Sequence, residues 1–410
     1  MNAHTQPQAV REGLCIGCGY CGSLDGMTMT KRSDGYFEPR AVNEVSDRTF
    51  QRIEAVCPGR NAGDVITPDA SATEPTLDLM WGAFYDCMVG HSTDDALRRN
   101  GSSGGVISAL AAWLIETSEV DGVVATFYDP SFPIGTVAAM VDSPERAAMS
   151  GGSKYSPAAP LSLLDDLRAR DGRFAVIGKP CDIATLRRAM AAGDPVRDKI
   201  AYLLSFYCAG TPSDDGNRGV LDYMNAPGPD ALKSFRHRGD GWPGSTRAIA
   251  KDGKEFTCTY NESWGKILRS HTHKLCIVCP DGIGEQADLV AADAWYGTED
   301  GYPVFEEADG RSLIMTRTPT GRDLLAKARE AGRIECSALD VREIDVMQPG
   351  QRKRRRELGL RIAAYRLLGR HTPPGYNRKA IKAYQHGMTA RQKFSVFYGT
   401  LKRIASTLFQ

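Results

Sequence analysis

The feature that most constrains this chain is the spacing of its first cysteines. Cys15, Cys18 and Cys21 form a C-x2-C-x2-C triplet, and a remote Cys57 is followed by Pro58. Three thiolates at this spacing wrap one corner of an iron–sulfur cube, and a cysteine before proline supplies a remote fourth ligand in bacterial ferredoxins. The pattern predicts a 4Fe–4S cluster. A structural zinc knuckle is the alternative, although two C-x2-C pairs that share a cysteine are unusual for zinc.

A second cysteine set is dispersed along the chain. Cys276 and Cys279 form one C-x2-C pair, while Cys181 and Cys208 each follow an apolar run that predicts a buried strand. Because strand ends in α/β sheets point into a shared crevice, the four thiols could hold a second cluster. Spacing alone leaves the alternative open that Cys181 and Cys208 are small buried hydrophobes. The remaining cysteines have no motif partner and are expected to be inert: Cys87, Cys258 and Cys336.

Composition places these cysteines in a reducing compartment. The chain has 410 residues, 42% hydrophobic and 25% charged, which is typical of a soluble protein with two or three domains. The longest apolar run, 106–115, is too short to span a membrane, and the polar stretch 1–10 lacks a secretory signal. We therefore expect a cytoplasmic protein, in which clustered cysteines are metal or redox ligands.

The pattern of apolar runs predicts an α/β or α+β fold in three parts. Residues 1–75 would form a small ferredoxin-like module with a polar linker at 61–75. Residues 76–345 would form a layered α/β region, with an internal boundary near 170. Residues 346–410 would form a basic helical tail. Within the α/β region we expect strands at 122–127, 174–178, 201–206 and 287–292, helices at 106–116, 184–192 and 320–331, and a hairpin around 251–254.

Two Gly/Ser segments are candidates for binding an anion. Gly101, Ser102, Ser103, Gly104 and Gly105 open the helix predicted at 106–116. Free backbone N–H groups, serine hydroxyls and the helix dipole together favour an anion there, although a plain helix cap explains the same residues.

The second segment, 151–155, carries Lys154 and Tyr155. A cation and an aromatic ring suit a phosphate and a planar ring, and an ordinary loop is the alternative. Segment 236–244 contains His237, and His271 and His273 precede the second cysteine pair. These histidines are weak candidates for moving a proton, because a histidine in a loop is usually a surface residue.

The net charge of +1 conceals a basic tail. Residues 351–410 hold fifteen Lys and Arg against one acid, whereas the preceding 350 residues hold 36 basic and 49 acidic residues. The alternatives for the tail are a solvated helix face, docking of an acidic ferredoxin, or contact with an anionic membrane. The membrane alternative uses an apolar helical face formed by Phe394, Phe397, Leu401, Ile404 and Leu408. Nucleic acid is not expected as a partner, since no recognised nucleic-acid module accompanies the charge.

Taken in order, these segments resemble the coenzyme F420 hydrogenase/dehydrogenase beta-subunit family. The resemblance spans roughly residues 10–350 and rests on six pieces in the right order: the Cys15 triplet with Cys57-Pro58, Gly101–Gly105, Gly178-Lys179-Pro180-Cys181, 208–213, Gly241-Trp242, and the Cys276 pair followed by Ala287-Asp288-Leu289 and Asp293-Ala294-Trp295. The sequence departs from the family at Ala292, where the family often has glycine before the aspartate.

The resemblance implies a flavin and at least one 4Fe–4S cluster, and one subgroup of the family carries two. For this chain we expect FAD and two 4Fe–4S clusters. The resemblance favours a second cluster on Cys181, Cys208, Cys276 and Cys279. It also implies flavin contacts from Gly101–Gly105, Lys154, Tyr155, Trp242 and Asp293.

The function we expect is that of an iron–sulfur flavoprotein oxidoreductase. Electrons would pass from a ferredoxin or similar redox protein through the clusters to FAD and on to a small organic acceptor. The alternative is an electron-transfer subunit of a larger hydrogenase or dehydrogenase, with no substrate site of its own. A zinc-stabilised interaction protein is a third class.

Overall fold

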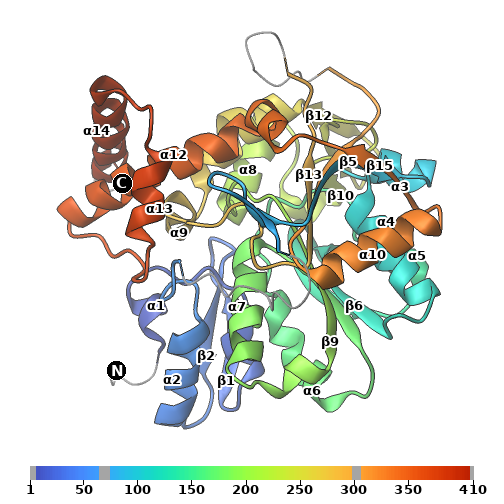
Figure 1. Ribbon diagram of the computed structural model, residues 1–410, viewed down its shortest axis with the longest axis horizontal. Helices are drawn as coiled ribbons and strands as arrows, with labels where there is room; N and C mark the ends of the chain where they lie inside the picture. The colour runs from blue at the N-terminus through green and yellow to red at the C-terminus, as the bar shows by residue number, and fades with distance from the viewer. Residues whose placement is uncertain (1–5, 64–73, 298–305, 407–410) are drawn as a thin grey trace.

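One eight-stranded mixed sheet organises the protein (Figure 1). The computed structural model describes residues 6–63, 74–297 and 306–406. Four parallel strands form the centre of the sheet: β13 (Leu289–Asp293), β9 (Ile200–Phe206), β8 (Phe174–Gly178) and β6 (Gly122–Asp129). Antiparallel strands flank them, with β7 (Phe132–Val141) beyond β6 and β14 (Ser312–Thr316), β5 (Asp86–Ser92) and β15 (Ile334–Ala338) beyond β13.

Both faces of the central strands are buried, which explains their continuous apolar sequences. In β8, Ala175 and Ile177 face α4 (Val106–Glu116) and α10 (Pro319–Glu330). The alternate residues, Phe174 and Val176, share a core with α7 (Pro180–Ala191) on the opposite face. Figure 1 shows α4 and α10 on the right of the sheet and α7 on its left.

The N-terminal module packs against α7 rather than standing apart. It consists of α1 (Gln8–Arg11), the 3-10 turn η1 (Tyr20–Ser23), the hairpin β1 (Met27–Lys31) and β2 (Phe37–Ala41), and α2 (Asp47–Val56). Its apolar side chains join those of α7, β8 and β9 in one core. Most of the predicted linker, residues 64–73, lies outside the described residues.

One buried carboxylate ties the module to the α/β region. Asp194, at the end of the loop after α7, accepts hydrogen bonds from Tyr20 at 3.1 Å and from Arg168 at 2.9 Å, and it pairs with Arg52 at 2.6 Å. Tyr20 and Arg52 belong to the module and Arg168 to α6 (Leu164–Ala169). Asp194 therefore adds ion pairs and hydrogen bonds to the apolar contacts that join the module to the α/β region.

A smaller sheet and several short elements surround the main sheet. The predicted hairpin at 251–254 is present between β11 (Thr246–Ala250) and β12 (Glu255–Cys258), and β10 (Leu232–Arg236) pairs with β11. The remaining elements are β3 (Thr76–Asp78), β4 (Gly82–Phe84), α3 (Asp95–Asn100), α5 (Pro144–Ala148), η2 (Pro160–Leu163), η3 (Pro195–Asp198), α8 (Asp214–Tyr223), η4 (Pro229–Ala231), η5 (Asn261–Ile267), η6 (Leu268–His271), α9 (Lys274–Ile277), η7 (Val341–Glu343) and α11 (Ile344–Met347).

The last part of the chain forms three helices at one side of the molecule, drawn in red in Figure 1: α12 (Pro349–Leu367), α13 (Arg378–Tyr384) and α14 (Ala390–Ser406). The expected apolar face of α14 is divided, since Ile404 is buried in a small core with α12 whereas Phe394 is 67% exposed. Leu408 lies outside the described residues. Within the part of the chain that the structure describes, none of the helices combines the length and the apolar character that crossing a bilayer requires.

The expected mixed α/β architecture is confirmed, and most predicted elements are present within two residues of their expected bounds. The main difference is α7, which begins at Pro180 instead of 184. Proline suits the first helical position because its missing N–H has no helical partner there. Lys179 and Asp182 complete the start, since the Asp182 carboxylate accepts the backbone N–H of Lys179 at 3.0 Å. Cys181 consequently lies in the first turn of a helix.

Candidate functional site

The first four cysteines gather around one small cavity. Cys15, Cys18, Cys21 and Cys57 line a void of about 20 Å³ between the module and Thr185 of α7. Cys15 and Cys18 lie on the loop that leads into η1, Cys21 lies within η1, and Cys57 caps the C-terminus of α2. The structure therefore brings the remote cysteine to the triplet, as the sequence pattern requires.

Two positions between these cysteines accept only glycine, because the backbone there has positive φ and because neighbouring backbone atoms leave no room for a side chain. Gly17 and Gly19 have positive φ values of 72° and 99°. A Cβ on Gly17 would lie 2.6 Å from the carbonyl oxygen of Phe37 in β2, and one on Gly19 would lie 2.4 Å from the backbone N of Ser162 in η2. Any larger residue would push the cysteine loop away from both walls.

The chemistry of this donor set fits an iron–sulfur cluster. Burial raises the pKa of Cys15 to about 11 and that of Cys18 to about 12, and burial with the neighbouring thiols raises the pKa of Cys21 and Cys57 as well. Four buried thiolates would need a cationic centre to compensate their charge. Among the described residues, no group of three or more His, Cys, Asp or Glu side chains is arranged to hold a single metal ion.

The second four cysteines also converge, from three separate segments. Cys181 lies in the first turn of α7, Cys208 follows β9, and Cys276 and Cys279 lie in and just after α9. Burial is the main cause of their raised pKa values, about 11 for Cys208 and about 12 for Cys279. Thiols of the same set raise the pKa further at Cys181, Cys208 and Cys279. The backbone N–H of Thr211 donates to Cys276 Sγ at 3.4 Å, so the segment after Cys208 is in contact with the cysteine pair.

A buried ion pair lies between the two cysteine sets. Lys179 Nζ donates to Asp182 Oδ2 at 2.8 Å, at the start of α7. Besides burial, which dominates, Asp182 raises the pKa of Cys18 and Lys179 lowers it. The same Lys179 lowers the pKa of Cys181 and Cys208 in the second set. The start of α7 is thus close to both sets.

A cavity of about 290 Å³ opens at the carboxyl ends of β6, β8, β9 and β13. It is adjacent to the second cysteine set, because Cys208, Lys179 and Asp182 form part of its wall. The Oδ1 atom of Asp182 is buried without a hydrogen-bond partner among the described residues. The rest of the wall is rich in aromatic rings: Tyr155, Phe206, Tyr207, Tyr260, Trp264 and Trp295. Such a site suits a planar ring system that brings a hydrogen-bond donor.

The predicted glycine-rich turn lines this cavity, with one exception. Gly101, Ser102, Ser103 and Gly105 are on its wall and Gly104 is not. The N–H of Gly104 donates to the Ser312 hydroxyl at 2.9 Å, and a Cβ there would lie 2.7 Å from the backbone oxygen of Gly90. Gly104 therefore serves close packing of the turn on β5 and β14. The N–H groups of the first turn of α4 have no helical partners and remain suited to an anion.

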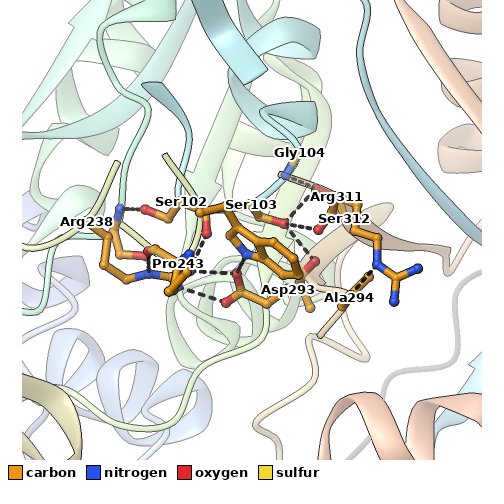
Figure 2. Close-up of polar contacts among 12 residues, drawn as sticks. Ser102, Ser103, Gly104, Arg238, Pro243, Asp293, Ala294, Arg311 and Ser312 are labelled. Atoms are coloured by element: carbon orange, nitrogen blue, oxygen red, sulfur yellow. Dashed lines mark hydrogen bonds and ion pairs between the residues drawn. The ribbon is translucent and has the colours of Figure 1, made fainter. Parts of the chain in front are cut away.

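A buried arginine fixes the far wall of the cavity (Figure 2). Arg238 forms a two-point ion pair with Asp293 at the end of β13, at 2.8 and 2.9 Å, and it also donates to the backbone oxygen of Ser102. The indole N–H of Trp242 donates to the same carboxylate at 2.8 Å and the ring stacks on Trp295. Trp242 thus supports the wall from behind instead of lining it. Arg238 lies in segment 236–244, but its local sequence does not predict this role.

Lys154 is the uncompensated cation of the cavity. Its Nζ donates to the backbone oxygens of Ser150, Gly151 and Gly152 at 2.7 to 3.1 Å, and no carboxylate among the described residues pairs with it. Burial, followed by the charge of Arg236, lowers the pKa of Lys154 to about 7. An anionic group in the cavity would supply the missing counter-charge.

Comparison with known proteins agrees with this arrangement. Residues 87–165 match the N-terminal part and residues 171–342 the C-terminal part of the coenzyme F420 hydrogenase/dehydrogenase beta subunit, so the two matches cover more than half of the chain. The chain belongs to this family. The boundary between the two matches falls within the single large sheet, between β7 and β8.

Named relatives are similar over most of the chain. The coenzyme F420 hydrogenase subunit beta of Methanococcus voltae is 23% identical over 276 residues, which cover 66% of this chain and 89% of that protein. The coenzyme F420-dependent sulfite reductase of Methanocaldococcus jannaschii is 29% identical over 336 residues, covering 77% of this chain and 46% of that protein. The expected oxidoreductase class is confirmed by this family membership.

A solved structure shows the same fold. A chain of the F420-reducing NiFe hydrogenase complex from Methanosarcina barkeri superposes with a TM-score of 0.54 and 19% sequence identity. The match covers 70% of this chain and 95% of that one. Helices α12 to α14 lie beyond residue 342, where the family match ends.

The three candidate histidines do not line the cavity. His237 is fully buried, its ring nitrogens contact Tyr128 and Asn217 at 3.0 and 2.8 Å, and burial lowers its pKa to about 3. His273 accepts the backbone N–H of Leu275 and so caps α9, the helix that carries Cys276. His271 is exposed at the end of η6. The contacts of His237 and His273 therefore give both residues a structural role.

Proposed function

We propose that this chain is an iron–sulfur flavoprotein oxidoreductase that passes electrons between a ferredoxin-like protein and an organic acceptor. The observation that carries the proposal is the spatial order of the sites. The first cysteine set, the start of α7, the second cysteine set and the cavity follow one another, each adjoining the next. An electron path needs this kind of continuity.

In this proposal each cysteine set holds one 4Fe–4S cluster. The first set comprises Cys15, Cys18, Cys21 and Cys57, and the second Cys181, Cys208, Cys276 and Cys279. Burial raises the pKa of these thiols and so disfavours the thiolate form. Bound iron would compensate the negative charge of four thiolates in each set. The module 1–75 would serve electron entry, region 76–345 the relay and the flavin, and the tail 346–410 the support of the second cluster.

FAD would occupy the cavity at the strand ends. The first turn of α4 and Lys154 would hold its phosphates, and the aromatic wall would hold its ring. When bound, these cofactors supply one-electron relay at the clusters and two-electron storage at the flavin. Arg238 and Asp293 would keep the wall rigid, and the Asp182 carboxylate would accept a hydrogen bond from the ligand.

Anaerobic analysis of iron, sulfide and flavin in the purified protein tests the proposal. About eight irons and one FAD per chain, with broad absorption near ~400 nm, are expected from two 4Fe–4S clusters and a flavin. About four irons would remove the second cluster. A colourless protein that binds zinc would overturn the proposal, because zinc thiolates do not absorb visible light.

A second candidate follows from the names of the relatives, several of which are subunits of larger enzymes. In that case the chain would relay electrons to or from a partner subunit without a substrate of its own. Turnover of an organic acceptor by the isolated chain with reduced ferredoxin distinguishes the two. Turnover supports the free-standing reductase, and reduction of the flavin without turnover supports the relay subunit.

The small organic acceptor, the cytoplasmic location and the ferredoxin partner stay predictions from the sequence. The tail bears on the last of these. Of the five consecutive cations 352–356, Arg355 is buried against Glu285 and Arg354 turns inward, while Lys353 is 72% exposed. Two of these five cations therefore make contacts within the protein, and the predicted membrane or ferredoxin contact would use the exposed cations.

A further inference from the structure

The C-terminal helices cover the loop that carries the second cysteine pair. The backbone oxygen of Cys276 accepts a hydrogen bond from Arg354 at 2.8 Å. The next two carbonyls along the loop accept from Arg361 at 3.4 Å and from the Tyr376 hydroxyl at 2.6 Å. Three successive carbonyls of a cysteine loop are thus satisfied by residues that lie beyond the family match.

Arg354 also reaches a second cysteine loop. One arm of its guanidinium donates to the backbone oxygen of Cys276 and the other to that of Ala209, the residue after Cys208. A planar guanidinium with two donating arms fixes the separation of the two loops more firmly than a single bond would. Two cysteines that are 68 positions apart in sequence are in this way held by one side chain.

The charge of Arg354 is not neutralised within the part of the chain that the structure describes, since no carboxylate there lies within ion-pair distance of it. Arg361, by contrast, pairs with Glu357. The two guanidinium bonds of Arg354, to the carbonyl oxygens of Ala209 and Cys276, place this cation beside the loops that carry Cys208 and Cys276.

We propose that Arg354 is a positioning residue for the second cluster, which both holds the loops of Cys208 and Cys276 together and raises the reduction potential of the cluster. The inference rests on the proposed function, because it requires a cluster at this cysteine set. Reduction of the cluster adds one electron and no proton, so the negative charge of the site grows by one. A fixed cation nearby stabilises the reduced form more than the oxidised form.

The test is a reductive titration of the anaerobic holoenzyme with dithionite, followed by electron paramagnetic resonance. Signals are assigned to the second cluster in a Cys18→Ala background. Arg354→Gln removes the charge, Arg354→Lys keeps it, and Lys353→Gln is the matched control, since it removes an exposed cation from the adjacent position of α12.

We expect Arg354→Gln to lower the reduced-to-oxidised ratio of the second cluster about tenfold at a fixed potential, which is about 59 mV for a one-electron couple. Arg354→Lys and Lys353→Gln should stay near the wild-type value. If the wild type holds about eight irons and Arg354→Gln leaves the potential unchanged, the inference is wrong and the proposed function stands. If the wild type holds only about four irons, bound by the first set, the second cluster and this inference are overturned, while a flavoprotein with one cluster stands.

Loss of the second cluster in Arg354→Gln would itself support the holding role, provided that the first cluster and the flavin stay bound. Arg354→Lys then tests the role of the charge. If this variant holds the second cluster at the wild-type potential, the charge raises the potential as proposed. If the variant holds the cluster at a lower potential, the proposed effect of the charge is wrong.

Discussion

The two cysteine sets reach the same kind of arrangement by opposite routes. Three of the four cysteines in the first set lie within seven consecutive residues, and the fourth ends a helix of the same module. The second set draws on the start of α7, the end of β9 and the α9 loop, and residues of the tail fasten it. The first set is built by local sequence and the second by the tertiary fold.

The two cysteine sets should therefore depend on different parts of the fold. The first cavity needs two glycines with positive φ and a hairpin next to it, all within the module and its contact with α7 and η2. The second set exists only when the parallel sheet, α7, the α9 loop and α12 are all in place. Changes to the sheet or the tail should therefore affect the second set first. Changes inside the module should affect the first set alone.

Removing one ligand from each set gives the largest expected effect. Cys18→Ala should lower the iron content from about eight to about four atoms per chain and abolish flavin reduction by a ferredoxin-like donor. It should leave the flavin bound, because no cysteine of the first set lines the large cavity. Cys208→Ala should lose the other four irons and some flavin as well, since Cys208 is part of the cavity wall. Iron, sulfide and flavin analysis measures both variants.

Cys336→Ala is the matched control, because this cysteine lies in the edge strand β15 outside both sets. It should keep all of its iron and flavin. A Cys18→Ala protein that lacks flavin would show that the module is required for the α/β region to fold, and the two sets would then not be independent.

The carboxylate that joins the module to the α/β region should be next in effect. Burial alone would raise the pKa of Asp194, but hydrogen bonds from Arg168 and from the backbone N–H of Val196, with the charges of Arg168 and Arg52, hold it at about 2, below its ordinary value of 3.8. Asp194→Asn leaves Arg168 and Arg52 without their shared acid and should lower the free energy of unfolding by about 3 kcal/mol at pH 7. Urea denaturation of the two proteins measures the loss.

The pH dependence of this effect has a definite sign. A carboxylate with a lowered folded pKa stabilises the protein above its unfolded pKa and loses that contribution as the pH falls through its folded value. The gap in stability between wild type and Asp194→Asn should therefore be full above about pH 4 and close toward pH 2. A gap that stays constant over this range would mean that the loss came from altered packing and not from the charge.

Lys154 should produce a smaller effect, confined to the cavity. Lys154→Met removes a cation that has no acidic partner among the described residues, so flavin should bind roughly tenfold more weakly, as expected for one charged hydrogen bond. Because burial lowers the pKa of Lys154 to about 7, its charge is lost as the pH rises through that value. Wild-type affinity for flavin should fall from pH 6 to pH 8, and the affinity of the variant should not.

Fluorescence titration of the flavin-free protein measures both affinities. Lys251→Met, which removes an exposed lysine from the 251–254 hairpin, is the control for charge alone. A variant that binds flavin as tightly as the wild type would place the phosphates away from Lys154.

The contrast between a set built by local sequence and a set built by the tertiary fold explains which parts of the structure could be predicted from the sequence. The first set was predictable in full, because the C-x2-C-x2-C spacing and the Cys-Pro pair are local, and so were strands such as β8, whose apolar run is buried on both faces. The grouping of Cys181 and Cys208 with the Cys276 pair needed the rule that neighbouring parallel strands end at one edge.

Contacts that join distant segments could not be predicted from spacing. Arg238 lies 55 residues from Asp293, and Arg354 lies 78 residues from Cys276. Nothing in the local pattern of either arginine distinguishes it from a surface cation. The flavin contact expected of Gly104 stays a prediction, and its close packing could not be foreseen, because a glycine that packs against two strands and one that approaches an anion look the same in sequence.

The smallest change that should still separate the two sets is Tyr376→Phe. The Tyr376 hydroxyl donates to the backbone oxygen of Val278, between the cysteines of the α9 loop, and the variant removes that one bond while keeping the ring. A single hydrogen bond to a neutral carbonyl contributes about 1 kcal/mol, so the loop should open about fivefold more often. Iron release to a chelator should speed up for the second cluster by a similar factor and stay unchanged for the first. Tyr398→Phe, on the exposed side of α14, should change neither rate. Equal acceleration at both clusters would contradict the comparison, because it would mean that the tail stabilises the whole protein and not the second set in particular.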